Sequence, residues 1–202
     1  MNIYQENVEV FNIETQHKKM DRRTIYTRNV ICEAFLSAKN GKAFNDITVA
    51  DICRIAEISR GTFYLHYKNT SEVLDEVLDR ALSETHSLHN QLYPESCGVT
   101  QKCTYPLCQY IRNSETYRCL FFDDALSSYV IEKIFTTHKD EIIKIWGKKS
   151  KLSPDQLSMV AYFQLSGCFS AAKRSENMDD DTWKQMQQFI DQFIRNGLQS
   201  FE

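Results

Sequence analysis

The sequence predicts a protein built only from α-helices. Three prolines and six glycines in 202 residues leave long stretches in which a helix can continue unbroken. Hydrophobic residues make up 42% of the chain, and many recur three or four positions apart, as Val49, Ile52, Cys53 and Ala56 do. The length is ample for a proper core, in one large domain or two small ones.

Composition also indicates a cytoplasmic protein. No stretch of about 18 uncharged apolar residues occurs, so no membrane span is expected. The start lacks a basic segment followed by an apolar run, which argues against secretion. The seven cysteines are an odd count without a pairing pattern, as expected for reduced thiols.

The chain begins with residues 1–17, which show no helical period and are expected to form a loosely ordered arm. A first helix is expected from about Lys18 to Lys39, with Ile31 and Phe35 on its apolar face, and Asn40-Gly41 ends it. We expect one or two phosphate contacts from the basic residues of its first half: Lys18, Lys19, Arg22, Arg23 and Arg28.

The stretch from Ile47 to Ser71 predicts a helix-turn-helix. Thr48 stands at the N-cap of a first short helix that continues to Ala56. After a break at Glu57-Ile58, Ser59 can cap a second short helix. Such a motif lays its second helix in the major groove of DNA.

The second helix carries side chains suited to reading DNA. Hydrogen-bonding groups on its exposed side come from Arg60, Thr62, Tyr64 and His66. Phe63 points back to the core, and Gly61 removes a side chain where the helix approaches the DNA backbone. Arg60 supplies the long bidentate donor that guanine accepts.

This run resembles the TetR family of transcriptional repressors, over roughly Arg22 to Leu78. The segments that carry the resemblance are Ile47-Thr48-Val49-x-x-Ile52, Ala56 with Ile58-Ser59-Arg60-Gly61-Thr62-Phe63-Tyr64, and His66-Tyr67-Lys68-Asn69. Well-known members place a lysine where this chain has Thr70, and some carry a base-reading arginine where it has Ala50. We therefore expect Arg60 to carry most of the base readout.

The motif and the resemblance together predict a set of DNA-contacting residues. Thr70 or Ser71 is expected to cap the following helix, so that its free N–H groups, with Tyr67 and Lys68, face a DNA phosphate. The predicted residues are Thr48, Ser59, Arg60, Gly61, Thr62, Tyr64, His66, Tyr67, Lys68 and Thr70.

The distribution of charge supports a local contact with nucleic acid. The chain carries a net charge of −3, but Lys18 to Thr70 holds ten lysines and arginines against five acids, a net of +5 that leaves −8 for the rest. A basic module joined to an acidic body is typical of a protein that binds DNA through one part.

The next helix, as far as about Leu88, joins this module to a body, and Tyr93 to Gly98 break the helical pattern. In the TetR family the middle helices surround a small-molecule pocket, so the resemblance implies an effector, here a largely hydrophobic one. The predicted lining is Tyr105, Tyr110, Tyr117, Phe121, Tyr129 and Trp146, with ordinary core packing as the alternative for each.

Two long helices are expected to close the chain, one starting at Ser153-Pro154-Asp155 and one after Asp179. The resemblance implies that these helices from two subunits form a four-helix dimer interface, whereas a monomer core is the alternative. The predicted interface residues are Gly167, Ala171, Trp183, Phe189, Ile190 and Phe193.

A metal or oxidant sensor is a further alternative. His86 and His89 lie three positions apart and are followed by Cys97, Cys103, Cys108 and Cys119, but the spacing fits no standard closed metal site. No phosphate-binding loop, nucleophile elbow or His-Glu-x-x-His motif occurs, so neither an enzyme nor a cofactor or bound metal is expected.

The sequence thus predicts an all-α fold of about nine helices, with an arm (1–17), a DNA-binding domain (18–70) and an effector-binding and dimerisation domain (71–202). The expected function is that of a homodimeric repressor that binds a palindromic operator in double-stranded DNA until a small molecule releases it. One alternative is a regulator of the same class controlled by a protein partner, a metal or an oxidant. The least favoured is an enzyme or carrier in which the helix-turn-helix is only structural.

Overall fold

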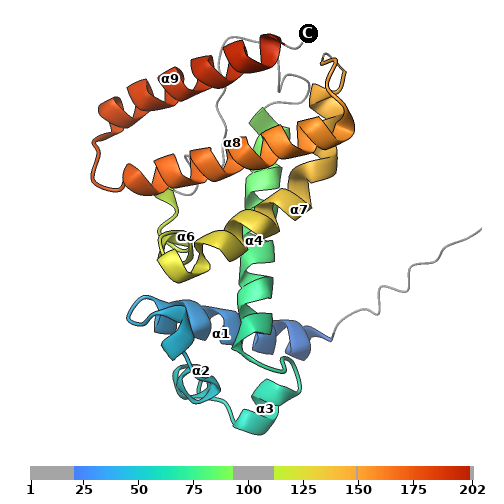
Figure 1. Cartoon of the computed structure of the whole chain (residues 1–202). Helices are drawn as coiled ribbons and strands as arrows, with labels where there is room; N and C mark the ends of the chain where they lie inside the picture. The colour runs from blue at the N-terminus through green and yellow to red at the C-terminus, as the bar shows by residue number, and fades with distance from the viewer. Residues whose placement is uncertain (1–20, 93–111, 149, 201–202) are drawn as a thin grey trace, which may run out of the picture.

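The computed structural model describes residues 21–92, 112–148 and 150–200, and all regular structure in these ranges is helical (Figure 1). The predicted all-α fold is therefore confirmed. No helix in the described ranges is both long and apolar enough to serve as a membrane span. The helices are α1 (Arg22–Lys39), α2 (Val49–Ile55), α3 (Arg60–Tyr64), α4 (Thr70–Leu92), α6 (Arg118–Phe121), α7 (Ser127–Trp146), α8 (Pro154–Arg174) and α9 (Asp180–Gln199), with short 3-10 helices η1 (Phe44–Asp46) and η2 (Asp124–Leu126).

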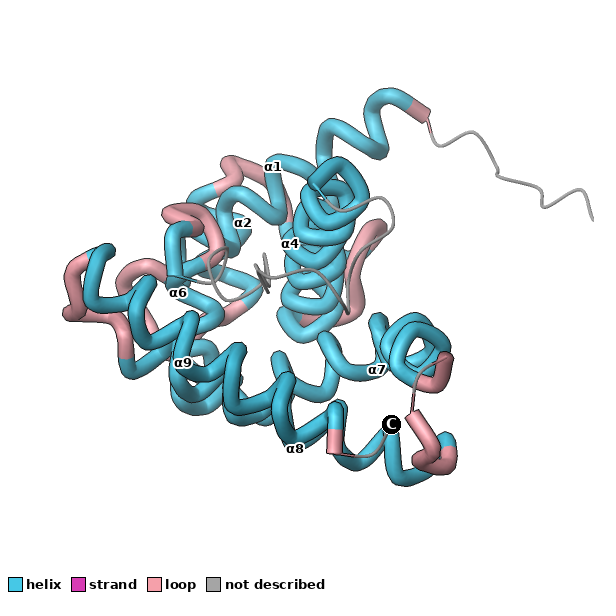
Figure 2. Tube along the Cα trace, turned by 90° about the horizontal axis from the view of Figure 1, so that it is seen from above, coloured by secondary structure: helices cyan, strands magenta, loops and turns pink. Residues whose placement is uncertain are grey.

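Helix α4 connects the two parts of the molecule. Its first half packs against α1, which also contacts α2, and α2 contacts α3. Its second half rises into the body, where α7 packs against both α4 and α8 (Figure 1). Helices α8 and α9 lie side by side at the end of the body opposite α3 (Figures 1 and 2).

The apolar core is continuous from the module into the body. In the module, Phe35, Ile52 and Phe63 are fully buried by neighbouring helices. In the body, Phe121 and Phe169 are buried in the same cluster. Because α1 also contacts α6, the module rests on the body through two elements, α4 and α6.

Helix α1 begins at Arg22, where Asp21 caps it by accepting a hydrogen bond from the backbone N–H of Arg23. The predicted start at Lys18 lies outside the described residues, as does the predicted arm. The predicted end at Lys39 is confirmed, with Asn40 as the C-cap.

Candidate nucleic-acid interface

Helix α2 begins with a capping box. The Thr48 hydroxyl accepts from the backbone N–H of Asp51 at 3.1 Å, and the Asp51 carboxylate accepts from the backbone N–H of Thr48 at 3.1 Å. Lys42 pairs with the same carboxylate at 2.9 Å, and the hydrogen bonds from Lys42 and Thr48 hold the pKa of Asp51 well below its usual range. The Thr48 side chain, predicted to contact DNA, thus also fixes the start of α2.

The turn between α2 and α3 is closed by a Schellman arrangement. The backbone N–H of Ile58 donates to the carbonyl of Cys53 at 3.0 Å. Glu57, between the end of α2 and Ile58, has a φ of 53°, in the left-handed region that glycine usually fills. The chain therefore makes this turn with a glutamate in a conformation that favours glycine.

Helix α3 is capped by Ser59, whose hydroxyl accepts from the backbone N–H of Thr62 at 3.0 Å. Phe63 is fully buried, which fixes the inner face of the helix. On the outer face, Tyr64 is 57% exposed, and Arg60 and Gly61 are exposed as well. Thr62 and His66 are half-buried at its sides.

Leu65, the C-cap of α3, continues this outer face and is 81% exposed. It was not among the predicted site residues, because an apolar side chain on a short helix is normally assigned to the core. The helical period does identify its position. Leu65 lies two residues from each of the core residues Phe63 and Tyr67, and a residue two positions away on a helix points to the opposite side.

Tyr67 differs from the sequence-based expectation. Only 3% of it is exposed, and its hydroxyl donates to Glu76 on α4 at 2.8 Å and lies 3.5 Å from the Cys32 sulfur. Burial, together with these hydrogen bonds, raises the pKa of its hydroxyl. A phosphate contact by this hydroxyl does not fit its position, because the group is used to join α3 to α1 and α4.

Arg28 is occupied in the same cluster. Its guanidinium lies 4.7 Å from the centre of the Tyr67 ring and pairs with Glu76, which also binds Arg80 at 2.5 Å. Burial alone would raise the pKa of Glu76, but the hydrogen bonds from Arg28, Tyr67 and Arg80 outweigh it and leave that pKa below its usual value. Arg28 therefore joins α1 to α4 and is withdrawn from the predicted group of phosphate-binding residues.

The cap of α4 is Asn69, rather than the expected Thr70 or Ser71. Its side-chain oxygen accepts from the backbone N–H of Glu72 at 3.0 Å, and the Glu72 carboxylate accepts from the backbone N–H of Lys68 at 2.8 Å. The backbone N–H groups of Glu72 and Lys68 are thus already hydrogen-bonded, although the N–H groups at this helix start were expected to face a phosphate. The Lys68 ammonium extends into solvent, 89% exposed and 3.6 Å from Glu72.

Three arginines remain available on this side of the molecule. Arg22, Arg23 and Arg60 are exposed, and none of them forms an ion pair with another residue in the described ranges. Arg22 and Arg23 stand at the start of α1, and Arg60 is the first residue of α3.

The residues predicted to line an effector site are dispersed. Tyr105 and Tyr110 lie outside the described residues. Tyr117 and Phe121 belong to the buried core, and Trp146 is half-buried near the end of α7. Tyr129 is 40% exposed, and its hydroxyl donates to Asp75 on α4. Burial and this hydrogen bond raise the pKa of Tyr129 to about 12.

The predicted interface residues of α8 and α9 fall into two groups. Phe189 and Phe193 are 67% and 69% exposed, Gly167 is exposed, and Ala171 and Ile190 are half-buried. Trp183, by contrast, is only 3% exposed, with the Arg112 guanidinium 5.7 Å from its ring centre, so it belongs to the core of its own chain. Two further large apolar side chains of α8, Met159 and Phe163, which were not among the predicted interface residues, are 72% and 74% exposed.

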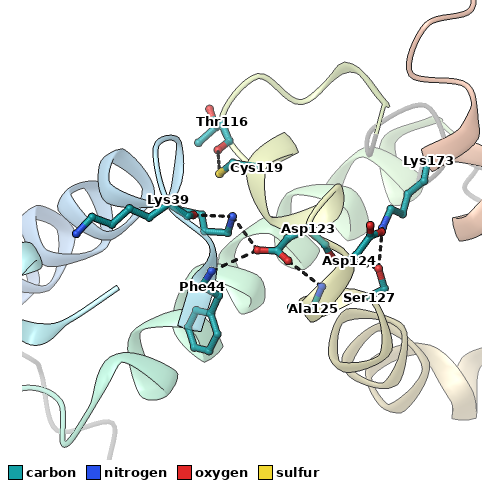
Figure 3. A network of polar contacts seen from close by, with 10 residues as sticks. Lys39, Phe44, Thr116, Cys119, Asp123, Asp124, Ala125, Ser127 and Lys173 are labelled. Atoms are coloured by element: carbon teal, nitrogen blue, oxygen red, sulfur yellow. Dashed lines mark hydrogen bonds and ion pairs between the residues drawn. The ribbon is translucent and has the colours of Figure 1, made fainter. Parts of the chain in front are cut away.

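A polar network joins the module to the body (Figure 3). Lys39, at the end of α1, pairs with Asp123 at 2.8 Å, and their side chains are only 7% and 10% exposed. Asp123 also accepts from the backbone N–H groups of Phe44 at 3.4 Å and Ala125 at 2.8 Å. Burial alone would raise the pKa of Asp123, but the hydrogen bond from Lys39 and those from the backbone leave it below its usual value.

The network continues to α8 (Figure 3). Asp124, the neighbour of Asp123, pairs with Lys173 of α8 at 2.6 Å, and Lys173 also donates to the Ser127 hydroxyl at 2.8 Å. On the other side of the body, Lys133 of α7 pairs with Asp79 of α4 at 2.8 Å. The body therefore holds both α1 and α4 through charged contacts.

The described ranges contain no group of three or more histidine, cysteine or acidic side chains placed to hold a metal ion. Cys97, Cys103 and Cys108 lie outside them, as do the side chains of His86 and His89. Cys119 is half-buried, its thiol donates to the Thr116 carbonyl, and burial raises its pKa.

Comparisons with known proteins agree with this geometry. No protein-family model matches the chain. Over 70 residues, 34% of its length, the chain is 39% identical to an uncharacterized HTH-type transcriptional regulator, YxbF, of Bacillus subtilis. Over 72 residues it is 29% identical to the HTH-type dhaKLM operon transcriptional activator DhaS of Lactococcus lactis. The matched segments span 18% and 38% of those two proteins.

A crystal structure of a TetR transcriptional regulator from Streptococcus agalactiae is similar over nearly the whole fold. The TM-score is 0.55 at 18% sequence identity, and the match covers 84% of this chain and 96% of the other. The resemblance inferred from the motif is thus confirmed: the chain has the fold of a TetR transcriptional regulator, and about a third of it is similar in sequence to HTH-type regulators.

Proposed function

We propose that the chain is a sequence-specific DNA-binding transcriptional regulator, without enzymatic activity, whose helix α3 enters the major groove. The observation that carries this proposal is the outer face of α3. Arg60 stands there exposed and without an ion pair, while Phe63 anchors the opposite face in the core. An arginine in this position matches the two acceptors of guanine, O6 and N7.

Cations around α3 would hold the DNA backbone. Arg22 and Arg23 at the start of α1 and Lys68 after α3 are exposed, and contacts of this kind supply affinity without sequence preference. The net charge of +5 between Lys18 and Thr70 supports this role.

The same proposal includes a homodimer formed through α8 and α9. Each helix carries large exposed apolar side chains four residues apart, Met159 and Phe163 on α8 and Phe189 and Phe193 on α9. An apolar surface of this kind marks a protein interface. A two-fold dimer would place two copies of α3 on half-sites about one helical turn of DNA apart, so the operator is expected to be a palindrome.

The body is the place where binding would be controlled. A change in the body that moves Asp123 or α4 acts directly on α1, through Lys39 and through the packing of α4. A small hydrophobic effector remains a prediction, as do control by a protein partner, a metal or an oxidant. Repression also remains a prediction, since one of the matched relatives is named as an activator.

The test is a selection of binding sites from randomised duplex DNA, followed by affinity measurements at several salt concentrations. Replacing Arg60 by Ala is expected to cost about 1–3 kcal/mol on the selected operator and to relax the preference at one base pair per half-site. Lys68→Ala should weaken binding to all sequences alike and reduce the salt dependence.

Arg174→Ala is the matched control, because Arg174 is an exposed arginine at the end of α8, on the body. It should leave both affinity and specificity unchanged. A selection that yields no consensus sequence would overturn the proposed function. Unchanged specificity of Arg60→Ala would overturn only the role of Arg60.

A further inference from the structure

Leu65 is the most exposed of the large apolar side chains in the described part of the chain, at 81%. A single exposed leucine is common on protein surfaces and needs no special explanation. Its location is what makes it informative, because α3 lies at the end of the module farthest from α8 and α9 and presents its outer face to solvent (Figure 1).

Leu65 is the C-cap of α3 and keeps helical backbone angles, so it continues that outer face by one residue. Phe63 and Tyr67, four residues apart, are both buried and mark the inner face. An α-helix turns by about 100° per residue, so Leu65, two residues from each, points almost directly away from the core. Gly61 precedes it by four residues and therefore lies on the same face.

Gly61 leaves room around the Leu65 side chain. Side chains of a helix lean toward its N-terminus, but no Leu65 atom lies within 4 Å of a Cβ atom placed at Gly61. A Cβ atom added at Gly61 would meet only the Ser59 hydroxyl oxygen, at 3.6 Å. The surface around Leu65 is thus open enough for another molecule to approach the helix closely.

The surroundings of Leu65 select the kind of group that fits it. Leu65 lies between Tyr64, which is exposed, and His66, which is half-buried, and Arg60 is exposed at the start of the same helix. The base edges in the major groove have a similar composition. They carry hydrogen-bonding groups and one kind of apolar group, the C5-methyl of thymine. A purely apolar partner would leave the surrounding polar groups unpaired, at a cost in free energy.

We propose that Leu65 contacts the C5-methyl group of a thymine in each half-site and is a determinant of sequence specificity separate from Arg60. The inference rests on the proposed function, since it requires that α3 enters the major groove. The recognition of DNA would then combine an apolar contact by Leu65 with the hydrogen bonds proposed for Arg60.

The test replaces thymine by deoxyuridine, one position at a time, in the selected operator. Uracil pairs as thymine does and lacks only the methyl group. For wild-type protein we expect an affinity loss of about fourfold to tenfold at one position per half-site, the value of burying one methyl group. Leu65→Ala removes the contact from both half-sites, so it should lose about the square of this factor on the thymine operator, and it should no longer distinguish thymine from uracil at that position.

Met178→Ala is the control, because Met178 is a partly exposed apolar residue in the turn between α8 and α9. It should retain the full dependence on the methyl group. Melting temperatures of both variants should equal that of the wild type, because neither side chain belongs to the core.

Two results would overturn the inference while leaving the proposed function intact. In one, wild-type protein binds its operator specifically but tolerates uracil at every position. In the other, Leu65→Ala is weaker yet still distinguishes thymine from uracil, as it would if Leu65 touched only the sugar–phosphate backbone. Failure of the selection to yield any consensus is a different result and would remove the proposed function itself.

Discussion

The helix-turn-helix module and the α8–α9 end of the body differ in how far they cover their large phenylalanine side chains. In the module, Phe35 and Phe63 are fully covered by helices of the same chain. At the other end, Phe163 and Phe189 are two-thirds or more exposed. Phe35 and Phe63 are therefore covered within the chain itself, whereas in the proposed dimer a second copy of the chain would cover Phe163 and Phe189.

The largest effect is expected when charged residues are placed on the exposed apolar face of α9. Replacing Phe189 and Phe193 together by Asp should convert a dimer into monomers and abolish tight operator binding, because a single half-site offers too few contacts. Sedimentation and operator titration measure the two effects. The module should remain folded, because neither side chain belongs to its core.

Gln188→Asp provides the control, since Gln188 is exposed on α9 but points away from the apolar stripe. It should leave assembly and binding unchanged. A wild-type chain that sediments as a monomer at micromolar concentration would contradict the proposed dimer.

The joint between the two regions is the next target. Asp123→Ala leaves the Lys39 ammonium buried without its carboxylate, and removal of one partner from a buried ion pair costs about 3–5 kcal/mol of unfolding free energy. Urea unfolding should show this loss. The double variant Lys39→Met, Asp123→Leu should recover most of it, because no uncompensated charge remains buried.

Glu176→Ala is the matched control for Asp123→Ala. Glu176 pairs with Arg118 at 3.0 Å, close to the distance between Lys39 and Asp123, but both side chains are 40% or more exposed. Its removal should cost about 1 kcal/mol or less. Equal losses in the two single variants would show that burial of the Lys39–Asp123 pair has no energetic importance.

The smallest effect is expected inside the module, at Glu57. Its left-handed φ costs a non-glycine residue about 1–2 kcal/mol, while glycine gains chain entropy of about 0.5–1 kcal/mol on unfolding. Glu57→Gly should thus raise the unfolding free energy by roughly 0.5–1 kcal/mol. Glu57→Ala removes the same carboxylate but retains the backbone cost, so no comparable gain is expected, and an equal gain in both variants would point to charge instead.

Local signals in the sequence predicted the local structure well. Thr48 and Ser59 were identified as caps because each bonds to a backbone group three residues ahead, within the reach of a sequence pattern. The all-α fold follows from the helical period of the apolar residues, and the end of α1 at Lys39 from the Asn40-Gly41 pair that follows it. Asn69 was missed as the cap of α4 because Thr70 and Ser71, which are equally good caps, follow it directly.

Long-range contacts could not be predicted in the same way. Tyr67 was assigned to DNA and Trp183 to a dimer, but each is buried by partners distant in sequence, Cys32 and Arg112 respectively. A large amphipathic side chain suits an interior as well as an interface. Only the packing of the helices decides between an interior and an interface for these two residues. Leu65 was missed for another reason, because an apolar residue beside a short helix was assigned to the core although the helical period places it on the outer face.

The burial of the Lys39–Asp123 pair has a consequence for how the module can move. When the two charges separate slightly, they lose their attraction before water can reach them, so intermediate positions are higher in free energy than either the closed or the fully hydrated open state. A joint of this kind would act as a latch, with a closed position, a hydrated open one and a barrier between them. Small displacements within the body would thereby be absorbed, and only one large enough to admit water to both charges would open this contact, while α1 stays packed on α4.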